Sequence, residues 1–183
     1  TLGFEQGFIS AASSTMTATV DFNSTTDFTD ATVTGLALED LSDAQTAYVD
    51  NSLYVGLSAG GSQGVDDDGN VALGENALGA LDNSGADLNV AIGYSALLVA
   101  TSSDNNTAVG YDALRNTGSS NNTAIGANAL TANTFGTYNT AVGSLALFDN
   151  TTGDFNIAVG ESALGNNIGA DANIAIGYLA LLN

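Results

Sequence analysis

The chain of 183 residues contains no cysteine, histidine, lysine, proline or tryptophan, and Arg115 is its only basic residue. Without histidine and cysteine it lacks the side chains of Ser-His-Asp and Cys-His nucleophile systems and of imidazole or thiolate metal sites. Without lysine it lacks the amine for Schiff-base chemistry and the cation that most often contacts a phosphate. The composition therefore excludes many enzyme classes, and we expect no enzymatic activity.

Positive charge is nearly absent, while negative charge is abundant. The chain has 20 Asp and Glu residues and a formal net charge of −19 at pH 7. Nucleic acid and anionic lipid are themselves negative, so such a chain repels both. Only 11% of the residues are charged and 44% are hydrophobic, which distinguishes the chain from a charged disordered tail. No segment approaches the roughly 20 apolar residues of a membrane span, so we predict no membrane insertion.

What the chain does contain is a repeated motif. The consensus Asn-[Thr/Val/Ile]-Ala-[Val/Ile/Leu]-Gly-x-x-Ala-Leu occurs seven times in residues 70–183, and a weaker eighth repeat begins at Ser52. Successive glycines of the seven repeats lie 19, 17, 16, 17, 17 and 17 residues apart. A period of this length is too short for a helix pair or a propeller blade, and it fits one coil of a parallel β-solenoid. The repeat glycines are Gly74, Gly93, Gly110, Gly126, Gly143, Gly160 and Gly177.

Positions in each repeat are counted here from its glycine. Positions −3 and −1 alternate with Ala at −2, and this period of two is typical of a strand. We predict that the glycine turns the chain with a positive φ and that Ala-Leu at +3 and +4 begins a return segment. Stacked coils would form an aliphatic column at −1 and a leucine column at +4. The Asn at −4 would either form a stacked amide ladder or satisfy backbone groups of the turn. Ala at −2 would form a separate strip without bulk, which another surface can approach closely.

We therefore predict an all-β chain in which residues 52–183 form a parallel β-solenoid, or β-roll, of about seven to eight coils. The alternative is a short helix at each Gly-x-x-Ala-Leu segment, because Ala and Leu favour helix. Each such segment lasts only one or two turns and follows a glycine, which favours the solenoid. A helical turn on the return segment is compatible with both.

Residues 1–51 lack the repeat and are predicted to form a small, β-rich assembly module. Residues 16–22 alternate between polar and apolar side chains, and residues 31–38 are a second strand candidate. Residues 42–45 have the form of a capping box, which predicts a short helix that ends near Val49.

Both ends of the sequence carry apolar side chains that we predict to be subunit contacts. Phe4 and Phe8 lie in a segment that either is donated to a neighbour as a strand or docks on its own domain. Leu181 and Leu182 end the last coil without a polar capping segment. Solenoids need caps because an exposed terminal coil presents unpaired backbone groups. Either the chain continues or another subunit covers this end.

The motif resembles repeats in bacteriophage tail-fibre proteins and in the heads of trimeric autotransporter adhesins. The resemblance covers residues 70–183 and is weaker from residue 52, and the period is longer and less regular than in adhesin heads. Those heads are parallel β-rolls that assemble as trimers, with small residues where chains meet. The resemblance therefore implies a homo-oligomer located outside the cell or on a virion. It also implies that the alanines at −2 face the trimer axis: Ala72, Ala91, Ala108, Ala124, Ala141, Ala158 and Ala175.

Asp66, Asp68 and Asn70 form a candidate Ca²⁺ site, because carboxylate and amide oxygens are the ligands that Ca²⁺ prefers. The nearby glycine is out of register for an EF-hand loop, and Ala77 stands where that loop needs a bidentate glutamate. A solvated linker that enters the first full coil is the alternative. We expect no other cofactor.

Two further sets of residues suggest contact with sugars. Aligned aromatic rings could stack on surface glycans or could pack along the solenoid. Such rings stand one residue after the glycine or one residue before the repeat Asn, at Tyr94, Tyr111, Tyr178, Tyr138 and Phe155. Asn-x-Ser/Thr sequences make candidate N-glycosylation sites of Asn23, Asn105, Asn121 and Asn150.

These features favour a structural role. The leading hypothesis is a subunit of an extracellular fibre or appendage that self-assembles through its solenoid ends and small-residue faces. The alternative is a trimeric adhesin head that recognises surface glycans. A polysaccharide-degrading spike would need two carboxylates at a defined separation, and the sequence specifies no such pair. Arg115 is interpreted as a surface partner of a carboxylate.

Overall fold

A computed structural model describes four segments of the chain, namely residues 44–46, 52–61, 69–81 and 85–182. Contacts divide the chain into units of residues 1–35 and 36–183, and every described residue belongs to the second. Several predictions for the N-terminal part lie outside the described residues: the strands of residues 16–22 and 31–38 and the contact residues Phe4 and Phe8.

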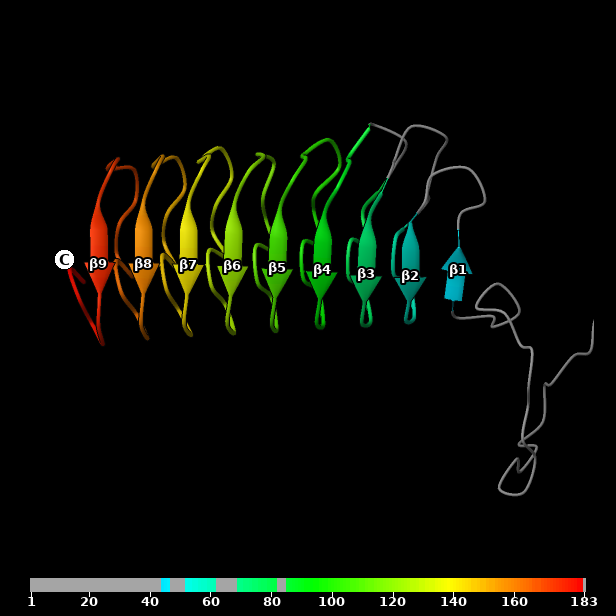
Figure 1. The fold of residues 1–183 in the computed structure, drawn as a ribbon, viewed down its shortest axis with the longest axis horizontal. Helices are drawn as coiled ribbons and strands as arrows, with labels where there is room; N and C mark the ends of the chain where they lie inside the picture. The colour runs from blue at the N-terminus through cyan, green and yellow to red at the C-terminus, as the bar shows by residue number, and fades with distance from the viewer. Residues whose placement is uncertain (1–43, 47–51, 62–68, 82–84, 183) are drawn as a thin grey trace, which may run out of the picture. The chain divides into compact units, whose positions relative to one another are not determined.

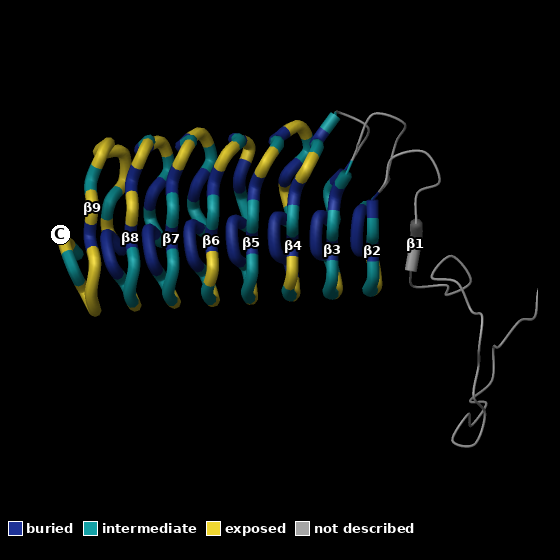
Figure 2. The backbone as a smooth tube through the Cα atoms, viewed as in Figure 1, coloured by how far each residue is buried: buried dark blue, intermediate teal, exposed yellow. Residues whose placement is uncertain are grey.

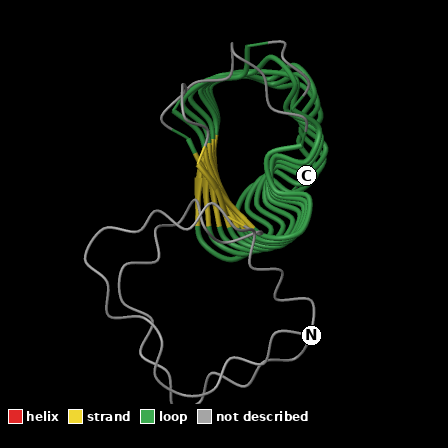
Figure 3. Ribbon diagram, turned by 90° about the vertical axis from the view of Figure 1, so that its right-hand side faces the viewer, coloured by secondary structure: helices red, strands yellow, loops and turns green. Residues whose placement is uncertain are grey.

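Within the described segments, nine strands of three residues form one sheet, in which the spatial order of the strands equals their order in the sequence (Figure 1). β2 to β9 run parallel, and β1 pairs antiparallel with β2. Seen along the stack, the strands lie on one side of each coil and loops close the rest (Figure 3). The predicted parallel β-solenoid is confirmed. The strands are β1 (Ala44–Thr46), β2 (Leu53–Val55), β3 (Val71–Leu73), β4 (Val90–Ile92), β5 (Thr107–Val109), β6 (Thr123–Ile125), β7 (Thr140–Val142), β8 (Ile157–Val159) and β9 (Ile174–Ile176).

The repeat glycines end the strands in the backbone conformation that the sequence predicts. All seven have φ between +128° and +138°, a region that other residues rarely adopt. The stacking of coils adds a second requirement, because a Cβ on Gly126 would lie 2.6 Å from the carbonyl carbon of Gly143 in the next coil. Glycine is therefore needed at this position for both its φ and its lack of a side chain.

The return segment consists of turns, and no described residue is helical, so the short-helix alternative is wrong for this part of the chain. Positions +2 and +4 have positive φ, as in Asn128 (56°) and Leu130 (51°). The N–H of Asn128 donates to Tyr111 in the preceding coil (2.8 Å), and that of Leu130 donates to Ala146 in the next coil (3.0 Å). A left-handed leucine costs about 1–2 kcal/mol, and burial of its side chain contributes about 2 kcal/mol in return.

Buried residues recur at corresponding places in successive coils (Figure 2). The core that they form consists mainly of small and aliphatic side chains. Ala at −2, Ala at +3 and Leu at +4 are its recurring members. The predicted leucine column is confirmed over six repeats, where its side chains are 0–4% exposed: Leu78, Leu97, Leu114, Leu130, Leu147 and Leu164.

The alanines at −2 belong to this core, so the expectation that they face another subunit is corrected. The first coil shows why position −2 is small. There Tyr54 occupies −2 and Gly60 occupies +4, and a Cβ on Gly60 would lie 2.5 Å from the Tyr54 ring. Positions −2 and +4 thus share one space within a coil, and an alanine at −2 leaves room for the leucine at +4. The exposed fraction is 0–2% for Ala72, Ala91, Ala108, Ala124, Ala141, Ala158 and Ala175.

The predicted helix of residues 42–49 is wrong over residues 44–46, which form β1. Gln45 pairs there with Tyr54 of β2. A single helical turn is unfavourable in water, whereas an unpaired edge strand offers a row of backbone donors and acceptors. The sheet therefore begins before residue 52, where the solenoid is predicted to start.

Candidate interaction surface

The outer face of the sheet consists of the side chains at −3 and −1, which point away from the core. In β2 to β9 these residues are half-buried or exposed, whereas the residue at −2 between them is buried. Ile125, for example, is 42% exposed although Ala124 beside it is fully buried. The outer face comprises Leu53, Val71, Val90, Thr107, Thr123, Thr140, Ile157 and Ile174 at −3, and Val55, Leu73, Ile92, Val109, Ile125, Val142, Val159 and Ile176 at −1.

No charged residue lies on the outer face, although the chain has a net charge of −19. A column of acidic residues lies instead in the turn before the strands, at Asp87, Asp104, Asp154 and Asp171. Its members contact neighbouring coils, as Oδ1 of Asp154 accepts a hydrogen bond from the N–H of Thr137 (2.7 Å). The solenoid thus presents an uncharged, largely aliphatic strip over eight strands, and exposed strips of this kind mark interaction sites.

The asparagines at −4 form the predicted amide ladder. Oδ1 of Asn122 accepts a hydrogen bond from the N–H of Asn139 (2.9 Å), and its Nδ2 donates to the carbonyl of Gly136 (2.9 Å). The first of these bonds recurs at every step from Asn70 to Asn173. Because each amide reaches the next coil, the ladder holds successive strands in register and aligns the columns of the outer face.

A second amide ladder, at position +7, is absent from the sequence-based predictions. Nδ2 of Asn150 donates to Oδ1 of Asn133 (3.1 Å), and Nδ2 of Asn167 donates to Oδ1 of Asn150 (2.8 Å). Nδ2 of Asn150 also donates to the carbonyl of Gly153 (3.0 Å), so it ties the loop to the ladder. The signal was an Asn seven residues after the glycine in three consecutive repeats.

Comparisons with known proteins were made with the chain as a whole. No family model matches it, and no curated protein or solved structure matches it. Within the described segments, no helix has the length and apolar character needed to cross a membrane. The function of the protein is therefore inferred from its own geometry.

Asn70 does not fit the candidate Ca²⁺ site, because both groups of its side-chain amide form hydrogen bonds in the ladder. The side chain is fully buried, and its Nδ2 donates to the carbonyl of Ala86 (2.6 Å). Its Oδ1 accepts from the N–H of Asn89 (2.9 Å). Asp66 and Asp68 lie outside the described residues. Among the residues that are described, no group of three or more His, Cys, Asp or Glu is placed to hold a metal ion.

The candidate glycosylation sites differ in accessibility. Asn150 is fully buried, and its amide hydrogen bonds in the second ladder leave no place for a glycan, so this site is corrected. Asn105 and Asn121 are exposed in the turn before the strands and stay candidates. Asn23 is outside the described part of the chain.

The aromatic residues pair with each other along the surface. The rings of Tyr94 and Tyr111 are stacked with centroids 5.6 Å apart, and those of Tyr138 and Phe155 are stacked at 5.1 Å. All four side chains are 47–57% exposed, and Tyr178 is 71% exposed. The rings therefore pack along the solenoid and also keep surface available to a partner.

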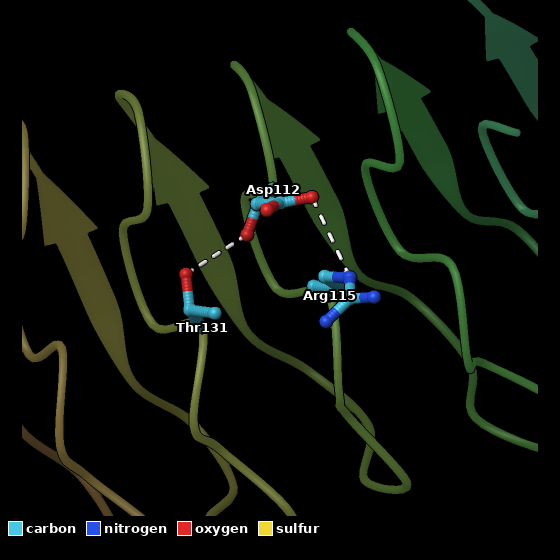
Figure 4. A network of polar contacts seen from close by, with 3 residues as sticks. All are labelled: Asp112, Arg115 and Thr131. Atoms are coloured by element: carbon cyan, nitrogen blue, oxygen red, sulfur yellow. Dashed lines mark hydrogen bonds and ion pairs between the residues drawn. The ribbon is translucent and has the colours of Figure 1, made fainter. Parts of the chain in front are cut away.

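Arg115 has the carboxylate partner that the sequence predicts. Its Nε lies 3.5 Å from Oδ1 of Asp112, and the hydroxyl of Thr131 donates to the backbone carbonyl of Asp112 (2.9 Å; Figure 4). Because the Arg115 side chain is 43% exposed, solvent screens the ion pair. The pair is a contact between neighbouring turns of one return segment, three residues apart in the sequence.

The leucines of the last coil differ from those before them. Leu181 is 57% exposed and Leu182 is half-buried, whereas Leu164 one coil earlier is 4% exposed. The proposed coverage of Leu181 and Leu182 by another subunit stays a prediction.

Proposed function

We propose that the protein is a structural subunit of an extracellular fibre or appendage, in which several copies pack side by side through the outer face. The observation that carries the proposal is the uncharged face on eight parallel strands of a chain with 20 acidic residues. Exposed aliphatic surface is unfavourable in water, so covering it stabilises an assembly. The proposed role is mechanical and needs no catalytic group.

A second copy of the chain is the occupant that fits the outer face. Side chains on this face repeat with the spacing of parallel strands, roughly 4.8 Å. A surface must have the same repeat to interdigitate with these side chains over all eight strands. Another copy of the solenoid has this repeat, whereas an irregular surface would match it at few points.

The size of the face suits a stable contact. Eight strands span about 34 Å, and the backbone from −5 to +1 spans about 20 Å, so the outer face together with its two margins covers about 700 Å². Standard interfaces bury about 800 Å² per partner. The stacked aromatic residues occupy positions −5 and +1, at the two margins of this area, and aromatic residues are enriched in interfaces.

The distribution of charge also suits contact between identical copies. Because positions −3 and −1 carry no carboxylate, packing them together buries no like charges, and the exposed Glu75 and Glu161 at +1 lie at the margin of the contact. The acidic column beside the face stays in solvent and keeps assemblies soluble. Packing about a common axis gives a closed homo-oligomer such as a dimer or trimer. The buried alanines at −2 take no part, and the outer face replaces them in the proposal.

The fibre role and the extracellular location are supported by the resemblance of the repeat to those of phage tail fibres and trimeric adhesin heads. Stacked coils joined by continuous ladders also make a stiff rod, which is what a fibre requires. Each coil contacts only its neighbours, as in other solenoids, so the rod extends by addition of coils.

Ile125→Asp is expected to dissociate the assembly, because it places a carboxylate in the middle of the outer face. Burial of an unpaired charge costs several kcal/mol, so the association constant should fall at least about a hundredfold. The measurement is the mass of the particle by light scattering over a range of concentrations. Ser102→Asp, in an exposed loop outside the strands, is the matched control and should leave the mass unchanged.

Thermal unfolding of both aspartate variants shows whether the solenoid itself is intact. Ile125 points outward, so the Ile125→Asp chain should keep its β-sheet circular dichroism. A monomeric wild-type protein at high micromolar concentration would contradict the proposal.

A glycan-binding head is the second candidate, and the exposed aromatic stacks favour it. Under this proposal, Phe155→Ala should weaken binding of surface oligosaccharides about tenfold, since an aromatic stacking contact contributes about 1 kcal/mol. Phe135→Ala is the matched control, because Phe135 is 75% exposed and takes part in neither stack. Titration calorimetry with a panel of oligosaccharides measures both. Equal affinities of the two variants would exclude the stack as the binding platform.

A further inference from the structure

The −3 column of the outer face changes in character along the solenoid. It is aliphatic in β2 to β4 and again in β8 and β9, but it is threonine in the three central strands. The −1 column is aliphatic throughout. The only hydroxyl groups on the face therefore lie in one row of three, at Thr107, Thr123 and Thr140.

These three hydroxyl groups make no hydrogen bond within the described part of the chain, and their side chains are half-buried. Several other threonines of the solenoid behave differently. The hydroxyls of Thr134 and Thr151 each donate to a backbone carbonyl at 3.0 Å. The row on the outer face thus offers donors and acceptors to a partner instead of to its own chain.

A hydroxyl that a partner covers must find a new hydrogen bond, because an unpaired buried hydroxyl is costly. A threonine row in a second copy supplies that bond, since each hydroxyl can both donate and accept. An aliphatic side chain supplies none. The row therefore distinguishes between possible alignments of two copies.

We propose that Thr107, Thr123 and Thr140 set the register in which copies pack, with the −3 columns of two parallel chains in contact. This inference rests on the proposed assembly through the outer face. In the aligned arrangement, all three hydroxyl pairs form and all eight parallel strands overlap.

Every alternative alignment loses one of these advantages. A slip by one coil leaves Thr140 of one copy against Ile157 of the other, and Thr107 of the second copy against Val90 of the first. An antiparallel arrangement with full overlap places both Thr140 hydroxyls against Val90. An antiparallel arrangement that pairs all three hydroxyls loses the contact of a whole strand at one end of each copy.

Disulfide formation between introduced cysteines measures the register. The chain has no cysteine, so a single substitution gives an unambiguous signal. A disulfide forms only when two Cβ atoms approach to about 4 Å. Ile157→Cys should therefore cross-link to itself in the aligned arrangement. A mixture of Ile157→Cys and Ile174→Cys, one of them carrying a tag, should give the mixed disulfide only after a slip by one coil.

The full chain with native threonines should give the self-disulfides at least about tenfold in excess over the mixed disulfide, because a slip leaves buried hydroxyls unpaired. Replacement of Thr107, Thr123 and Thr140 together by valine should make the two products comparable, while the particle mass stays the same. Replacement of all three by serine keeps the hydroxyls and should preserve the excess. Valine and threonine are both favourable in strands, so these variants should fold.

The outcomes distinguish failure of the proposed register from failure of the proposed assembly through the outer face. A monomeric wild-type particle overturns the assembly and the register with it. An assembled wild-type particle whose cysteine variants, with native threonines, give both disulfides equally overturns the register alone. So does a triple valine variant that retains the excess of self-disulfides.

Discussion

Gly126→Val is expected to lower the free energy of unfolding by at least about 4 kcal/mol, the largest effect of any single change considered for this chain. Gly126 has φ +138°, and an added Cβ would lie 2.6 Å from both the carbonyl carbon and the carbonyl oxygen of Gly143. Neither atom can move without separating two coils. For a chain of this size, the melting temperature should fall by about 10 °C or more.

Two controls separate this effect from ordinary changes of side chain. Asn128→Ala, in the same repeat, removes a half-buried residue at φ 56° and should cost about 1 kcal/mol. Gly118→Ala adds a Cβ at an exposed glycine whose φ is not left-handed and whose nearest contact would be 3.2 Å, so its effect should be small. Melting followed by circular dichroism measures all three variants. Equal melting temperatures for Gly126→Val and Asn128→Ala would contradict the stacked-coil fold.

Asn122→Ala should have the second largest effect, a loss of about 3 kcal/mol. Asn122 is fully buried, and its removal leaves the N–H of Asn139 without the Oδ1 acceptor that it contacts at 2.9 Å. The carbonyl of Gly136 also loses one of its donors. No water can reach these groups easily, so the cost of an unpaired donor in the core applies in full.

The neighbouring residue provides the matched control for this change. Asn121 is exposed, and Asn121→Ala should cost about 1 kcal/mol, mainly because Asn tolerates its φ of 64° better than Ala does. Chemical denaturation of the two variants under identical conditions gives the difference. A smaller loss for Asn122→Ala than for Asn121→Ala would show that the ladder does not stabilise the coils.

The period and its consequences were predictable from the sequence. A glycine every 16–19 residues, preceded by a strand-like alternation, determines where the coils turn. The Asn at −4 is short, polar and invariant among the seven full repeats, and stacking of such residues produces a ladder. The solenoid and the first amide ladder follow from these residues.

Which face of the strand is inside was harder to infer. An alternation of two shows that Ala124 and Ile125 lie on opposite faces, but it does not show which face the return segment covers. The first coil contained the evidence. It has a large residue, Tyr54, at −2 and the small Gly60 at +4, whereas the other coils have a small alanine at −2 and a large leucine at +4. The outer face, which is the candidate interaction surface, was for this reason misassigned.

Other features depend on contacts that the local sequence does not report. Leucine rarely adopts a positive φ. Leu130 does so because its N–H donates to Ala146 of the next coil while its side chain is buried in the core. β1 replaces the predicted helix because β2 supplies a pairing edge. In both cases, tertiary contacts override the backbone conformation that the local sequence favours.

The backbone pairing is the same between successive coils, which has a consequence for changes in chain length during evolution. Removal of residues 127–143 would join Gly126 to Ser144 and leave every hydrogen-bonding position opposite an equivalent one. Unequal recombination between similar stretches of a gene produces deletions and duplications of this kind. A change of length by a whole coil therefore preserves the contacts between the coils that remain.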